Sequence, residues 1–335
     1  MVFSELAPVR ENPRRGLSFP GHRSDGVGGL NTLMNQPLQQ ADVKWWDAIP
    51  NHPEFHRDSF GVSNADEGTW AILESEVKTG LVAQSHLPAT AQMCLDALRR
   101  PESAPADLAA IFARNPAFGE RVLALAQVAK WWPQAGNGAE ALSAIGTRRL
   151  RILTYAAALA TVFSERFGRD AQPYIQQAVA TATACHHVAT RLNLDADDAW
   201  LAGFFHDAGA ACVDEAAAQL ESRGWPLTHK AHFKAWKARL HSIAGAELTL
   251  AWDLPDDVVD GASHHFEKSG PLTSEMALVA LGTRIATRLR GREEDDGGMV
   301  VTESVTRGLR RDRLTLLATL TGVELAIDRA CDLVS

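Results

Sequence analysis

Apolar side chains recur three or four positions apart along most of the chain, which is the spacing of one face of an α-helix. The clearest stretches are SAPADLAAIFARN, AFGERVLALAQVAKWW and RDRLTLLATLTGVELAIDRACDLV. Alternation of apolar and polar residues with period two is not sustained anywhere, and no hairpin turn signals separate the apolar runs. The pattern therefore predicts an all-α protein.

Local signals place several helix boundaries. Acidic residues followed by helical spacing predict a helix from about Asp66 to Lys78. Gly146 separates a short predicted helix from a long buried one. In the stretch DADDAWLAGFFHDAG, the acids between Asp195 and Asp198 favour the start of a helix, and Gly209 favours its end.

The helical spacing is strongest over residues 85–290, for which we predict one domain made of two helical subbundles, 85–165 and 170–290. Residues 1–45 are rich in Gly, Pro, Asn, Gln and Arg and predict a disordered or loosely docked tail. Residues 46–84 predict an N-terminal helical extension, and residues 300–335 a C-terminal helical segment that packs back on the domain.

Composition and charge narrow the class of protein. Of 335 residues, 46% are hydrophobic, enough for a sizeable core, and the formal net charge is −8. A negative net charge does not favour binding to nucleic acid or to an anionic membrane, since both carry negative charge themselves. Four scattered cysteines without a C-x-x-C pair indicate reduced thiols, as in a bacterial-type cytosol. The N-terminus has no apolar segment of a signal peptide, so we expect a cytoplasmic protein without a membrane span.

Eight of the twelve histidines lie between residues 186 and 265. Imidazole is the commonest metal ligand in proteins, although core and surface histidines with ordinary hydrogen bonds are the competing interpretation. His186 and His187 fit a helix-packing or solvated role better than a ligand role. The remaining candidates fall into three patterns.

The first pattern is His206-Asp207, directly after an apolar run, where a buried carboxylate is costly unless it is paired or bound to metal. The second is His241, with Gly245 one turn later to permit a close approach of helices. The third is His264-His265 at the end of a short predicted helix. His265 shares a face with Val258 and Ala262 and should point toward the core.

The order of these patterns resembles the HD superfamily of metal-dependent phosphohydrolases, and more closely the HDOD family, the signal-output relatives of those enzymes. LAGFFHDAGA is similar to the family's aGLLHDIG. HSIAGAELTLAWDLPDDVVDGASHH is similar to its H-x-x-x-G-a-x-L-a-x-x-W-x-L-P-x-x-I-x-x-A-I-x-x-HH. A less specific likeness begins at SHLPATAQMCLDALRR, so the resemblance covers about residues 85–290 and implies the two-subbundle helical fold.

The resemblance also implies that two metal ligands are missing. Active relatives have a further histidine on the preceding long helix and an aspartate after the His-His pair. The matching positions here are Gln177, or its neighbour Gln176, and Thr283. Neither an amide nor a hydroxyl replaces a metal-binding imidazole or carboxylate. The remaining set could hold one Fe, Mn or Zn ion or form a buried hydrogen-bond network: His206, Asp207, His241, His264 and His265.

Three functions remain open at this level. The incomplete ligand set favours a non-catalytic regulatory output protein that acts through contacts with partner proteins, and it assigns no catalytic residue. The surviving histidines leave a metal-dependent phosphohydrolase of nucleotides or cyclic dinucleotides as the alternative. A nucleic-acid-binding regulator would depend on two arginine clusters, 148–151 and 307–313, for which a solvated helix face is the simpler explanation. Neither the ligand nor the oligomeric state follows from the sequence.

Overall fold

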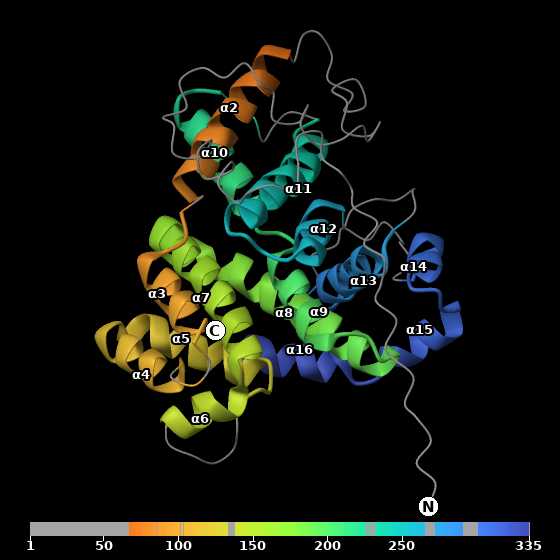
Figure 1. The fold of residues 1–335 in the computed structure, drawn as a ribbon. Coiled ribbons are helices and arrows are strands. Elements are labelled where there is room, and N and C mark those ends of the chain that lie inside the picture. Colours follow the sequence, from red (N-terminus) through yellow and green to blue (C-terminus); the bar gives the residue numbers. More distant parts are fainter. Residues whose placement is uncertain are drawn as a thin grey trace, which may run out of the picture. The chain divides into compact units, whose positions relative to one another are not determined.

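The structure is a computed structural model, and it describes residues 67–84, 86–100, 102, 104–132, 138–225, 227, 232–264, 272–290 and 301–334 (Figure 1). All of these residues belong to one unit, Ser63–Ser335. Helices without any strand make up the described regular structure, which confirms the all-α prediction. The predicted tail, residues 1–45, and part of the predicted extension, residues 46–66, lie outside the described residues.

The first group of helices comprises α2 (Glu67–Gln84), α3 (Ala89–Ala97), α4 (Ala104–Arg114), α5 (Pro116–Val128), α6 (Gly138–Ile145) and α7 (Thr147–Phe167). The short 3₁₀ helix η4 (Gly168–Ala171) leads into α8 (Gln172–Leu192), α9 (Ala196–Phe205), α10 (Ala210–Ser222), α11 (Phe233–Ala251), α12 (Asp256–His264) and α13 (Ser274–Leu289). The C-terminal helices are α14 (Glu303–Gly308), α15 (Arg313–Thr319) and α16 (Val323–Asp332).

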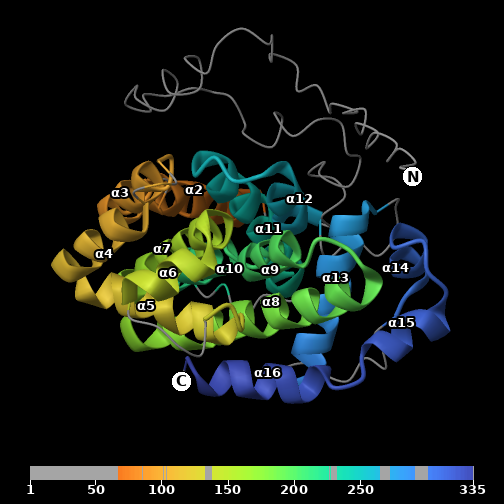
Figure 2. The same cartoon turned by 60° about the horizontal axis from the view of Figure 1, so that its bottom comes forward.

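Helix α8 lies at the centre of this unit because it is apolar on nearly every side. It packs against α9, α13 and α16, and Figure 2 shows α16 running along it. Alanine and threonine dominate its buried stretch, and such small side chains allow the neighbouring helices to approach closely. Helix α13 approaches α8 closely at Gly282, because a Cβ atom there would lie 2.3 Å from the Sγ atom of Cys185 on α8.

Two groups of helices pack around this centre. Helices α3 and α5 pack on α7, and α4 packs on α3, α5 and α6. On the other side, α2 and α11 pack on α10, and α12 joins α11 to α9 and α13 (Figure 1). A continuous aromatic core connects the groups: Trp131 packs on Trp200, Trp200 stacks on Phe204, and Phe205 meets Trp252 edge to face.

Several predicted boundaries agree with the structure, and two differ. Helix α2 begins at Glu67, close to the predicted start, but it continues to Gln84 instead of ending near Lys78. Gly146, with a φ of 82°, separates α6 from α7 as expected. The side chain of Asp195 caps α9 by accepting hydrogen bonds from the N–H groups of Asp197 and Asp198. The predicted end of α9 at Gly209 was wrong, because the helix ends at Phe205 and Gly209 instead precedes α10. His206 and Asp207 therefore lie in a turn.

The described helices bear on two further features of the sequence, namely its apolar runs and its first arginine cluster, residues 148–151. None of them combines the length and the apolar character that crossing a membrane requires. The first arginine cluster is largely neutralised, because Arg148 pairs with Asp195 and Asp198, and Arg149 pairs with Asp197. The charges of Arg148 and Arg149 are therefore compensated within the described residues.

Candidate functional site

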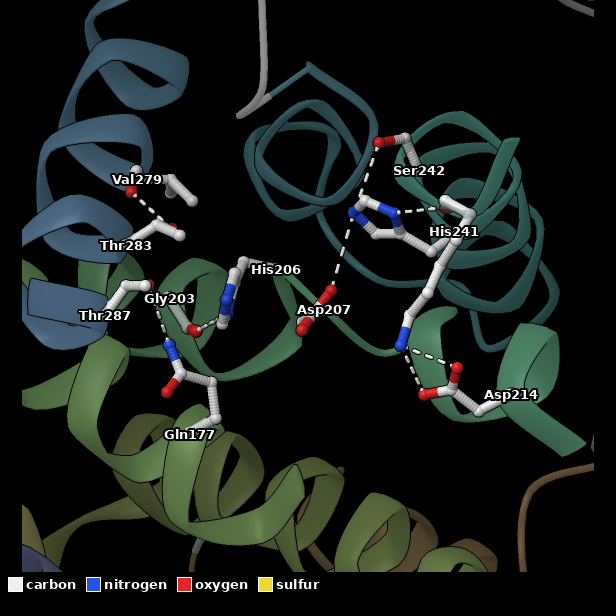
Figure 3. A network of polar contacts seen from close by, with 11 residues as sticks. Gln177, Gly203, His206, Asp207, Asp214, His241, Ser242, Val279, Thr283 and Thr287 are labelled. Carbon is white, nitrogen blue, oxygen red and sulfur yellow. Dashed lines mark hydrogen bonds and ion pairs between the residues drawn. The ribbon is translucent and has the colours of Figure 1, made fainter. Parts of the chain in front are cut away.

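The His-Asp pair lies in the turn between α9 and α10, at the buried end of α9 (Figure 3). Two backbone hydrogen bonds of 3.0 Å close this turn: the Ala208 N–H donates to the Phe205 carbonyl, and the Ala210 N–H donates to the Asp207 carbonyl. The preceding residues of α9 are buried and hold this end of the helix in the core. These hydrogen bonds and the buried end of α9 therefore hold the backbone of His206 and Asp207 in place.

His206 is held as a neutral imidazole. Its side chain is 1% exposed, and its Nδ1–H donates to the Gly203 carbonyl at 2.8 Å. Because a carbonyl only accepts hydrogen bonds, Nδ1 carries the proton and Nε2 carries the lone pair. Burial lowers the pKa of His206, and the nearby Asp207 carboxylate opposes this effect only partly.

His241 on α11 is tethered in the same way. Its side chain is 4% exposed, and its Nδ1–H donates to the Lys237 carbonyl at 2.9 Å. Its Nε2 atom lies 3.4 Å from Oδ1 of Asp207. Asp207 thus links the turn to α11 (Figure 3).

Gly209 allows the turn to lie directly on the backbone of α11. A Cβ atom at this position would lie 2.1 Å from the His241 carbonyl oxygen and 2.4 Å from the Gly245 nitrogen. A Cβ atom at Gly245 would meet nothing closer than 3.5 Å. The close approach predicted near Gly245 is present, but it requires the glycine at 209.

Gln177 of α8 and Thr283 of α13 both lie beside His206, on the side away from His241 (Figure 3). Both side chains are buried, 7% and 8% exposed. The Gln177 amide donates to Oγ1 of Thr287 at 3.4 Å, and the Thr283 hydroxyl donates to the Val279 carbonyl at 2.9 Å. The fold thus brings together the two positions where the resemblance places missing ligands, and neither side chain is a good metal ligand.

The described residues do not complete a metal site. His206, Asp207 and His241 supply suitable donor atoms, but within the described ranges no three His, Cys, Asp or Glu side chains are grouped to hold an ion. His264 is the last residue of α12, but its side chain and the whole of His265 lie outside the described residues. The predicted five-residue ligand set stays a prediction.

The other two histidines of interest lie away from this turn. The His187 Nε2 atom lies 3.1 Å from the Thr321 carbonyl oxygen, near the start of α16. The His186 ring packs edge to face on Trp131. Both contacts agree with the packing role expected for these residues.

Sequence patterns missed a polar group that supports His241. Lys237, whose carbonyl holds the imidazole, places its ammonium group 2.6 Å from the Asp214 carboxylate of α10. The Tyr174 hydroxyl of α8 donates to the same carboxylate. Burial, followed by this hydrogen bond, raises the pKa of Tyr174. No sequence spacing relates these three residues, since each lies on a different helix.

Comparison with known proteins identifies the family. The HDOD domain model matches residues 85–268, which is more than half of the chain. The protein therefore belongs to the HDOD family, as the resemblance of LAGFFHDAGA and the His-His stretch indicated. No curated protein matches this sequence.

Crystal structures of three bacterial proteins share the fold. One from Shewanella amazonensis, named as a proposed phosphohydrolase, has a TM-score of 0.55 at 20% identity and covers 77% of this chain and 98% of its own. A second from that organism, named as a proposed metal-dependent phosphohydrolase, has a TM-score of 0.54 at 18% identity, over 76% and 99% of the two chains. An HDOD domain protein of unknown function from Geobacter sulfurreducens has a TM-score of 0.54 at 16% identity, over 77% and 98%. At these identities the likeness concerns the fold.

The buried His206 makes a testable contribution to pH-dependent stability. Its folded-state pKa is lowered from the usual 6.5, so the unfolded chain binds the proton first as the pH falls. The stabilisation is fully present above about pH 6.5 and is lost below it.

We expect urea unfolding to give a smaller decrease in stability from pH 7.5 to 5.5 for His206→Gln than for the parent. His186 and His187 also have lowered pKa values but remain in both proteins, so the difference isolates His206. Equal decreases would contradict this prediction.

Proposed function

We propose that this HDOD protein is a non-catalytic regulatory output protein that acts through contacts with partner proteins. The observation that carries the proposal is the chemistry beside His206, where Gln177 and Thr283 occupy the two positions at which active relatives are expected to have ligands. The Thr283 hydroxyl is already engaged with its own helix. A site with these side chains keeps the HD arrangement at His206 and Asp207 but lacks donors for a two-metal centre.

The alternative function is a metal-dependent phosphohydrolase acting on a nucleotide or cyclic dinucleotide, and one observation favours it. His206 and His241 both donate Nδ1–H to a backbone carbonyl. Metal-binding histidines are commonly oriented in this way, because the bond fixes the tautomer that offers Nε2 as a ligand. Under this alternative, His206, Asp207 and His241, together with His264 and His265, would hold one Fe, Mn or Zn ion.

Metal content and turnover separate the two functions. We expect the purified full-length protein to contain well under one equivalent of Fe, Mn or Zn by mass spectrometry. We also expect no turnover of a panel of nucleotide and cyclic dinucleotide phosphoesters when each metal is added. The variant His206→Ala/Asp207→Ala should give the same result in both assays.

The phosphohydrolase alternative predicts the opposite result in both assays. Near-stoichiometric metal in the parent and none in the double variant, with hydrolysis lost in parallel, would establish the phosphohydrolase and end the non-catalytic proposal. Circular dichroism of the variant serves as the control for folding, since His206 is buried.

A further inference from the structure

The second arginine cluster differs from the first because the carboxylates of the described residues leave most of its charge uncompensated. Arg307, Arg310, Arg311 and Arg313 line one open cleft of about 620 Å³ at α14 and α15; we call it the arginine cleft. Its two carboxylates are already engaged: Glu303 pairs with Arg307, and Asp312 accepts hydrogen bonds from the backbone N–H and hydroxyl of Thr315.

Three of these arginines have no carboxylate partner within the described part of the chain: Arg310, Arg311 and Arg313. Arg310 also has a φ of 50°, in the left-handed region that favours glycine. An L-residue is strained there, whereas glycine adopts this conformation freely. The fold thus retains a guanidinium group at a position where glycine would be more stable.

An exposed apolar side chain lies next to this charge. Leu314, directly after Arg313, is 79% exposed, and Leu317 on the same short helix is 41% exposed. Isolated exposed leucines are common, but a leucine beside three uncompensated arginines has the composition of a contact site: an apolar anchor with a charged rim.

A pocket of opposite charge lies close by, between α9, α12 and α13. Its apolar floor includes Ala202 and Val279, its volume is about 80 Å³, and its rim carries Asp195, Asp198, Asp257 and Glu275; we call it the acidic pocket. Arg148 pairs with both Asp195 and Asp198, so one guanidinium is shared between these two carboxylates. Asp257 and Glu275 have no basic partner among the described residues, and burial together with the neighbouring carboxylates raises the pKa of Asp257.

The cleft and the pocket are neighbours on the protein. Ser274 lines the acidic pocket, and its hydroxyl donates to the carbonyl of Gly308, the residue after Arg307, at 3.4 Å. In a two-fold dimer whose axis passes between two adjacent patches of opposite charge, the positive patch of each chain faces the negative patch of the other. A second copy of the chain therefore matches both patches at once.

We infer that the protein self-associates as a two-fold dimer in which the arginine cleft of each chain docks on the acidic pocket of the other, with Leu314 entering the pocket. The net charge of −8 does not prevent this contact, because fields from distant charges are screened beyond about 8 Å at physiological salt. A nucleic acid fits the cleft less well, since Glu303 and Asp312 lie in its lining.

Sedimentation velocity of the full-length protein tests the dimer. We expect a dimer whose fraction rises with concentration at low salt and falls at high salt. Arg310→Glu and Asp257→Lys should each weaken association at least tenfold, and the two together should restore it. Arg310→Gly removes the charge while relieving the left-handed strain, so it should weaken association in a chain that is fully folded by circular dichroism.

Four outcomes would overturn the inference. If the protein is a monomer at every concentration in low salt, the arginine cleft does not bind a second copy of the chain, and another acidic partner would be its ligand. A dimer that none of these variants affects would lie on another surface. An assembly that grows past the dimer would exclude the two-fold arrangement. A double charge reversal no better than either single change would show that Arg310 and Asp257 do not meet.

Discussion

Gly209→Ala is expected to destabilise the protein by at least about 3 kcal/mol, at or above the upper end of the usual cost of overpacking a core. The added Cβ atom would lie 2.1 Å from the His241 carbonyl oxygen and 2.4 Å from the Gly245 nitrogen. Both are backbone atoms of α11 and cannot rotate away as a side chain could. The φ of Gly209 is −79°, which alanine adopts freely, so the cost is steric only. Urea unfolding followed by circular dichroism measures it.

A matched control lies on the same contact. In Gly245→Ala, the new Cβ atom meets nothing closer than 3.5 Å, which is ordinary van der Waals contact. We expect this variant to change the stability by less than about 1 kcal/mol, because alanine also favours a helix interior. If the two alanine variants have equal stability, the turn does not lie on α11 as described.

The second large effect concerns the two positions without metal ligands. We expect Gln177→His/Thr283→Asp to destabilise the metal-free protein by about 2–4 kcal/mol, because it places a carboxylate beside the buried His206. Added Mn²⁺ or Zn²⁺ should then restore stability, by about 2.7 kcal/mol at a hundredfold excess over the dissociation constant. The parent should not respond. Thermal unfolding with and without each metal measures the effect, independently of any activity.

The neighbouring glutamine supplies the control. Gln176 accepts a hydrogen bond from Arg290 at 2.8 Å, so its side chain is directed toward that residue. Gln176→His/Thr283→Asp should therefore lose stability without regaining it from metal. If both double variants respond equally to metal, Gln177 is not the position of the missing histidine.

Sequence spacing predicted the helices well because helical structure is encoded locally. Val258 and Ala262, placed on one inward face of α12, are both completely buried. The cap at Asp195 and the break at Gly146 follow from single residues with strong conformational preferences. The end of α9 was misplaced by four residues, because Gly209 was interpreted as a helix stop while its role is to let the turn contact α11.

The candidate site was predicted only in part, and the missing part consists of contacts between helices. His206, Asp207 and His241 could be selected from the sequence because they belong to recognisable stretches. The support that Lys237 and Asp214 give to His241 could not, since ion pairs between helices leave no periodic signal. The same holds for the acidic pocket, which gathers carboxylates from the starts of three helices.

The sequence by itself determined the all-α class and the HDOD family, and it predicts the loss of two metal ligands at Gln177 and Thr283. These follow from residue identity and from spacing within single helices, which one chain segment is enough to encode. Only the tertiary structure decided that the His-Asp pair lies in a turn pressed onto α11. It also decided that, among the described residues, Asp195, Asp197 and Asp198 pair with Arg148 and Arg149 of the first arginine cluster, while most of the second cluster has no carboxylate partner. Both outcomes depend on which helices pack together, and that is set by the burial of the whole core rather than by any local pattern.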